Sequence, residues 1–126
     1  MTYAYIKSQI MFQTNNDASD LGDFTPAIGD YINQGYDEML MAFRGVHVGS
    51  GDGETKALAN DSDVPELPEY AHRALVDFGT YMIYRNGNAV KQQRGNAYYM
   101  KYSEILAQLK YERSRAPFQF RNLYTS

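Results

Sequence analysis

Residues 67–111 constrain the fold of this chain more than any other segment. They contain two stretches with apolar residues at steps of three and four, the spacing of amphipathic helices, joined by the turn sequence RNGN at residues 85–88. The first stretch, 68–85, carries on one face Ala71, Leu75, Phe78, Met82 and Ile83. The second stretch, 88–111, carries Val90, Ala97, Tyr98, Tyr102, Ile105, Leu106 and Leu109. At about 1.5 Å per residue these helices are about 27 and 36 Å long, which predicts a hairpin whose second helix protrudes.

A further helix is predicted near the start of the chain, over residues 2–13. Tyr3, Ile6 and Ile10 form its apolar stripe, with Phe12 as a further candidate, and the polar run NND at residues 15–17 stops the helix. Together with the hairpin and the helix described next, it gives an all-α fold, a small four-helix bundle.

The remaining helix has the sharpest start signal in the sequence. Thr25 supplies a hydroxyl N-cap and Pro26 occupies the first helical position, while Gly45 is suited to close the helix in a left-handed conformation. Gly29 and Gly35 lie inside it. Each costs about 0.5–1 kcal/mol relative to alanine, so they indicate either close helix–helix approach or tolerance provided by strong flanking packing. The apolar positions of this helix are Ile28, Tyr31, Ile32, Tyr36, Met39, Leu40 and Phe43.

Size and charge narrow the class of protein. The chain has 126 residues and 44% hydrophobic content, enough for one modest core. Twelve basic against fifteen acidic residues give a formal net charge of -3, which disfavours a dedicated phosphate-backbone binder. Cysteine is absent, which excludes disulfides, thiolate zinc sites and cysteine nucleophiles. Neither a secretory signal nor a membrane span is visible, so we expect a soluble chain made in a cytosol, with no membrane partner.

Residues 46–66 form a glycine- and aspartate-rich segment that predicts a projecting loop between the second and third helices. Its centre reads GSGDG at residues 49–53. The β-branched flanks suit a two-stranded hairpin with its tip at 51–53, and an irregular loop fits nearly as well. Pro65 and Pro68 fix extended backbone just before the next helix.

Residues able to carry catalysis are few. His47 and His72 have no triad partner or metal-pair spacing, so both are predicted to be surface residues. Two acidic groups, Asp17 with Asp20 and Asp23, and Asp52 with Glu54, do not match a calcium-binding loop. The glycine run lacks the ending of a phosphate-binding loop. The sequence therefore predicts a protein that is not an enzyme, with no cofactor and no metal site.

Charged groups on the helices are predicted to be ordinary surface residues. Glu38 with Arg44, and Asp77 with Arg73 and Tyr81, are spaced for side-chain pairing on a helix surface. Such pairs are worth only a few tenths of a kcal/mol and require no substrate.

Residues 112–126 differ from the rest of the chain and divide it into a helical domain, 1–111 with the loop 46–66, and a C-terminal interaction tail. Pro117 predicts a helix stop, and aromatic residues then alternate as in a strand. Such an extended tail could add to the sheet edge or groove of a partner, or fold back over its own bundle. The partner-binding candidates are Arg113, Arg115, Phe118, Phe120, Arg121, Leu123 and Tyr124.

Four segments together carry a resemblance to a known family. They read LPEYAHRALVDFGT at residues 67–80, RNG followed by YYMKY at 85–87 and 98–102, and YINQGYDEM at 31–39. This pattern resembles the head-to-tail connector, or adaptor, proteins of tailed double-stranded DNA bacteriophages, over residues 24–110. The tyrosine content and the glycine-rich loop depart from the usual pattern.

The resemblance implies a structural ring subunit in the neck of a virion, assembled in the host cytoplasm. The ring, typically dodecameric, would dock under the portal protein, extend the DNA channel and provide the platform for the next neck or tail protein. Genomic DNA would only pass through, and an acidic lining suits that role. The C-terminal segment matches the family's portal-binding part by position. The loop corresponds to a variable region that contacts the neighbouring subunit or lines the channel, with candidates Val46, His47, Val48, Asp52, Glu54 and Lys56.

Two alternatives remain open from the sequence. One is a free-standing helical module, chaperone-like or regulatory, that captures a peptide between helices. The other is a hydrolase or metal enzyme, which requires that the loop containing Asp17, Asp20 and Asp23 bind an ion.

Overall fold

The chain folds into four α-helices, as predicted. The computed structural model describes residues 1–14, 25–49 and 55–125, with side chains placed in the ranges 1–14, 26–49 and 55–114. Its elements are α1 (Tyr3–Thr14), the 3₁₀ turn η2 (Thr25–Ala27), α3 (Ile28–Arg44), α4 (Glu69–Tyr84) and α5 (Ala89–Thr125). Within those residues there is no strand, which confirms the all-α class.

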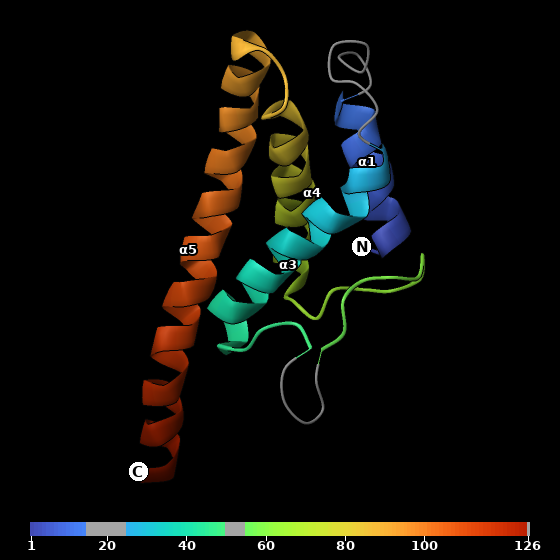
Figure 1. The fold of residues 1–126 in the computed structure, drawn as a ribbon. Coiled ribbons are helices and arrows are strands. Elements are labelled where there is room, and N and C mark those ends of the chain that lie inside the picture. Colours follow the sequence, from blue (N-terminus) through green and yellow to red (C-terminus); the bar gives the residue numbers. More distant parts are fainter. Residues whose placement is uncertain (15–24, 50–54, 126) are drawn as a thin grey trace.

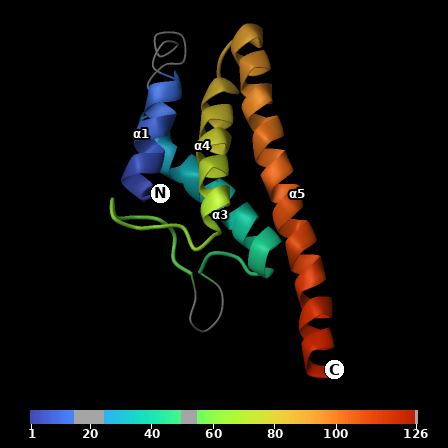
Figure 2. The ribbon, with the colours of Figure 1, turned by 180° about the vertical axis from the view of Figure 1, so that it is seen from behind.

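The core lies around α4, which contacts all three other helices. Figures 1 and 2 show α4 between α1 and α5, with α3 running obliquely across the bundle. Eleven of the sixteen α4 residues are buried, so the helix has no wholly polar face. The fully enclosed side chains around it include Ile10, Ile32, Leu40, Leu75 and Tyr102.

Glycines mark the places where helices approach closely, which confirms one of the two interpretations of Gly35. A Cβ atom there would lie 2.8 Å from the Phe78 ring of α4. A Cβ on Gly95 of α5 would lie 2.9 Å from the Cβ of Tyr84. Both distances are shorter than real Cβ atoms make. Helix α4 therefore packs closely against α3 and α5 at two positions where glycine has no side chain.

The boundaries of α3 follow the sequence signals with one shift. Helical backbone begins at Thr25, but its first three residues form the 3₁₀ turn and the α-helix begins at Ile28. Gly45 ends the helix with φ of 74°, and its N–H donates to the Met41 carbonyl at 2.9 Å. The predicted left-handed glycine cap is therefore confirmed.

The end of α5 corrects the predicted extended tail. The helix does not stop near residue 111 but continues through Pro117 to Thr125. Proline removes one backbone donor, the bond to the carbonyl four residues earlier, while arginine, alanine and glutamine around it are good helix formers. The structure therefore has helix where the alternation of aromatics in residues 118–124 predicted an extended segment.

The buried face of α5 also differs from the predicted one. Val90, expected in the core, is 58% exposed, and Ala97 is exposed as well. Tyr102 and Leu109 are buried as predicted, and the other two buried residues are Lys91 and Gly95, each of the four lying four or seven positions from the next. Close approach at Gly95 fixes the rotation of the helix, and the aliphatic stem of Lys91 can be buried at low cost.

In the loop between α3 and α4 the irregular alternative holds for the described residues 45–49 and 55–68, none of which forms a strand. One backbone bond crosses the loop, from the Gly49 N–H to the Thr55 carbonyl at 2.8 Å. The expected tip, residues 51–53, lies outside the described part, as do Asp52 and Glu54.

Candidate functional site

Helix α5 extends beyond the other helices of the bundle from about residue 113. Leu109 is the last buried residue of the helix among those with placed side chains. Beyond it, the Tyr70 hydroxyl donates to Glu112 at 2.6 Å, and Arg113 donates to the Met41 carbonyl at 3.3 Å. From Leu109 to Thr125 the helix runs about 24 Å further. Figure 1 shows this segment extending past the ends of α3 and α4.

Arg113 is the one predicted partner-binding residue whose side chain is described. It lies at the C-terminus of α3, where its positive charge faces the carbonyl end of the helix. A Cβ on Gly45 would lie 2.5 Å from the guanidinium, so the glycine cap also makes room for this arginine. The other six candidates lie further along α5, on helical backbone: Arg115, Phe118, Phe120, Arg121, Leu123 and Tyr124.

A groove of about 510 Å³ brings the two predicted candidate segments together. His47 of the loop and Arg113 of α5 line its walls, with Lys110 beside them. The α3 side is lined by Gln34, Asp37, Glu38, Met41 and Ala42. One wall is thus acidic and the other basic. The residue that sequence reasoning missed here is Asp37, which lies on α3 facing the loop.

Asp37 holds the start of the loop against α3. Its Oδ1 accepts the Val48 N–H at 2.7 Å, and its Oδ2 lies 3.1 Å from Nδ1 of His47. His47 is exposed, as predicted. No sequence signal identified this pairing, because Asp37 and His47 lie ten positions apart on either side of a helix end.

Glu38 is also engaged within the chain, because its carboxylate accepts a short hydrogen bond from the Tyr102 hydroxyl. Burial, and next the hydrogen bond and negative charge of Glu38, raise the pKa of Tyr102 far above its usual value. The tyrosine therefore remains a protonated donor at any working pH. The pair joins α5 to α3 beside the groove.

Two further side chains of α3 hold the second half of the loop. Asn33 makes a reciprocal pair of bonds with the Leu58 backbone, accepting its N–H at 2.8 Å and donating to its carbonyl at 3.0 Å. The Tyr36 hydroxyl accepts the Glu66 N–H at 2.8 Å. Lys56 and residues 57–60 line a hollow of about 460 Å³ above Tyr36. The described flanks of the loop are thus bonded along α3.

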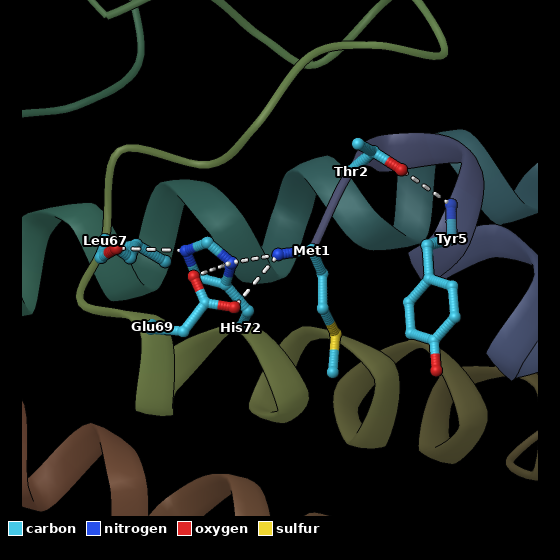
Figure 3. A network of polar contacts seen from close by, with 6 residues as sticks. All are labelled: Met1, Thr2, Tyr5, Leu67, Glu69 and His72. Carbon is cyan, nitrogen blue, oxygen red and sulfur yellow. Dashed lines mark hydrogen bonds and ion pairs between the residues drawn. The ribbon is translucent and has the colours of Figure 1, made fainter.

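His72 corrects a sequence prediction, because it is buried rather than on the surface. Its Nε2 donates to the Leu67 carbonyl at 2.9 Å, so that Nδ1 accepts from the Met1 ammonium, also at 2.9 Å (Figure 3). Glu69 accepts from the same ammonium at 3.2 Å, which lowers the pKa of Glu69. This network joins the start of α1 to the start of α4.

Asp77 is likewise buried, although its helix position predicted a surface residue. Burial raises the pKa of its carboxyl group, and the positive charges of Arg73 and Lys101 oppose that shift only in part. The sequence pattern could not indicate the burial of Asp77. It predicts one buried face of α4, whereas the other helices cover α4 on almost every side.

The described residues contain no group of three or more histidine, aspartate or glutamate side chains placed to hold a metal ion. Asp17, Asp20 and Asp23 lie outside the described residues. Among the helices so described, none is both long and apolar enough to cross a lipid bilayer. No protein-family model, curated protein or solved structure matches the chain.

Proposed function

We propose that the chain is a structural adaptor subunit of a phage head-to-tail connector ring. The observation that carries the proposal is the length of α5, which runs about 24 Å beyond Leu109, the last buried residue among those whose side chains are described. An isolated helical stretch of this length is marginal in water and gains its stability from packing against something else. The resemblance of residues 24–110 to connector proteins supports this kind of assembly.

In this proposal each part of the molecule has a separate task. The bundle around α4 is the rigid body of the subunit, and the distal part of α5 contacts the portal protein. Neighbouring copies complete the ring, which passes genomic DNA and receives the next neck or tail protein. The loop that follows α3 lines the channel or meets the neighbouring subunit.

The electrostatics are compatible with a channel. A formal net charge of -3 gives the chain little general attraction for DNA, so the genome could slide past without binding. The acidic stretch 57–69 contains four carboxylates and no lysine or arginine.

Removal of residues 117–126 tests the proposal. The shortened chain keeps every buried residue named above, so its thermal unfolding should match that of the full chain. We expect it to lose co-sedimentation with the cognate portal protein, because the contact segment is gone. If the shortened chain still assembled on the portal, the distal helix would not be the contact. A shortened chain that kept its binding to a peptide, beside a full chain that ignored the portal, would favour the peptide-capturing module.

A further inference from the structure

Two neighbouring residues of α5 contact the bundle on two sides. The Tyr70 hydroxyl, at the start of α4, donates to the Glu112 carboxylate at 2.6 Å, and Gln108 donates to the other oxygen of that carboxylate at 3.3 Å. On the α3 side, Arg113 donates to the Met41 carbonyl at 3.3 Å. The turn that contains Glu112 and Arg113 is therefore joined both to the start of α4 and to the end of α3.

Arg113 is built into the end of α3. It follows the buried Leu109 by four positions, so it continues the buried line of α5. The Met41 carbonyl that accepts its guanidinium also accepts the Gly45 N–H at 2.9 Å. A positive charge is favourable at the carbonyl end of a helix. The bundle thus holds α5 as far as Arg113.

Pro117 interrupts the backbone hydrogen bonds of α5 at the same residue. In an α-helix each N–H donates to the carbonyl four residues earlier, and proline has no N–H. The carbonyl that loses its helical donor is that of Arg113, because Pro117 lies four residues beyond it. The gap in the hydrogen-bond ladder therefore falls on the residue whose side chain holds the end of α3.

The residues beyond this gap have the start signal of a new helix. Proline is favoured at the first position of a helix, where its fixed φ fits and no donor is needed. The backbone remains helical from Pro117 to Thr125, so α5 can be described as two helices placed end to end. Sharp bends in long helices occur mostly at proline, because the missing bond lowers the resistance to bending.

We propose that residues 114–117 form a joint in α5. The bundle fixes the helix up to Arg113, and residues 118–125, which we call the arm, move as a helix about Pro117. Glu112 and Arg113 are positioning residues, because their contacts determine where the joint begins. In the proposed ring, the arm would adjust its direction to the portal while the bundle keeps its place. That consequence rests on the proposed function, whereas the joint itself does not.

Double electron–electron resonance measures the joint directly, because the chain has no cysteine and spin labels attach only to introduced ones. Ser8→Cys is an exposed reference on α1, Ala107→Cys is an exposed site on α5 before the joint, and Asn122→Cys labels the arm. We expect a narrow distance distribution between positions 8 and 107 and a broader one between 8 and 122. The distance between 107 and 122 should stay at about 22 Å with a narrow distribution, because the arm remains helical as it bends.

Two outcomes of these measurements would overturn the proposal. Narrow distributions for all three pairs would mean that α5 is one rigid helix. A broad distribution between positions 107 and 122 would mean that the end of α5 unravels instead of bending.

Pro117→Ala tests the cause of the bending. It restores an N–H that can donate to the Arg113 carbonyl, so the distribution between positions 8 and 122 should narrow to the width seen between 8 and 107. Gln119→Ala is the matched control, because it changes an arm residue without restoring a backbone donor, and it should leave the width unchanged. A Pro117→Ala variant as broad as the parent would contradict the joint.

Arg113→Ala tests the positioning role, with labels on Ser8→Cys and Ser114→Cys. In the parent this distribution should be as narrow as that between positions 8 and 107. In Arg113→Ala it should broaden, because the bond to the end of α3 is lost and the joint begins earlier in the helix. Lys110→Ala is the matched control, which removes a neighbouring cation and keeps that bond, and its distribution should stay narrow. An unchanged width in Arg113→Ala would contradict the positioning role.

These outcomes are separate from those of the proposed function. A rigid α5 in a protein that assembles on the portal contradicts the joint and leaves the adaptor role standing. A jointed α5 in a protein that ignores the portal supports the joint and contradicts the adaptor role.

Discussion

The two helices of the C-terminal hairpin, α4 and α5, share an interface but differ in how much of their surface is buried. Helix α4 is enclosed by the other three helices and buries residues around most of its circumference, including Leu75 and the ionisable Asp77. Helix α5 buries one line of residues and turns apolar side chains such as Met100 toward solvent. The difference indicates that stability resides around α4, while α5 carries exposed apolar surface that the proposed assembly would use.

The largest expected difference in stability is between truncating an enclosed apolar side chain of α4 and truncating an exposed one of α5. Leu75→Ala removes a fully enclosed side chain and should lower the free energy of unfolding by about 2–5 kcal/mol. Met100→Ala, at an exposed position, should change it by less than about 0.5 kcal/mol. Urea unfolding of both variants measures the difference. Equal losses would mean that α5 is as enclosed as α4, against the comparison.

A smaller effect is expected where the two helices touch. Helix propensity alone predicts that Gly95→Ala stabilises the protein by about 0.5–1 kcal/mol. Because the new Cβ would lie 2.9 Å from the Cβ of Tyr84, we expect instead a loss of about 1–3 kcal/mol as α5 shifts away from α4. Ala97→Gly, on the exposed side, should cost only the propensity term of about 1 kcal/mol. A Gly95→Ala variant that is more stable than the parent would show that this approach is not tight.

The smallest expected effect on stability comes from Asp77, the buried carboxyl group of α4, and it depends on pH. Burial raises the pKa of Asp77 in the folded state above its ordinary 3.8. The stabilising contribution of the protonated form is complete below the ordinary pKa and is lost as the pH rises through the folded pKa. Asp77→Asn cannot ionise, so its stability relative to the parent should increase between acidic and neutral pH.

Asp63 supplies a control of opposite sign for that pH series. Backbone N–H groups of Ala59 and Asn60 donate to its carboxylate and lower its pKa. Its contribution to stability is present above the ordinary pKa and is lost as the pH falls through the folded one. Asp63→Asn should therefore lose stability relative to the parent between acidic and neutral pH. Denaturation midpoints at several pH values test both variants, and parallel curves would contradict both assignments.

The helices could be predicted from local signals, because those signals act over a few residues. The glycine cap at Gly45 and the turn at 85–88 each depend on backbone preferences that the sequence states directly. The predicted end of α5 was wrong, because too much weight was given to a single proline.

Burial and contacts across the fold were harder to predict, because they depend on residues distant in the sequence. His72 is buried only because Met1 and Leu67 bring polar partners to it. The exposed side of α5 follows from the close approach at Gly95, which the apolar pattern of the helix did not reveal. His47 and Arg113 line one groove, which requires the C-terminal end of α3 to lie beside residues 110–113 of α5.

The most direct test of the central claim, that α5 serves assembly, is electron microscopy with mass determination of the protein mixed with its cognate portal, beside the protein alone. The account predicts a closed ring of this chain stacked on the portal, with the distal part of α5 at the contact. A protein that remains monomeric and separate from the portal, at concentrations where both are folded, would contradict it.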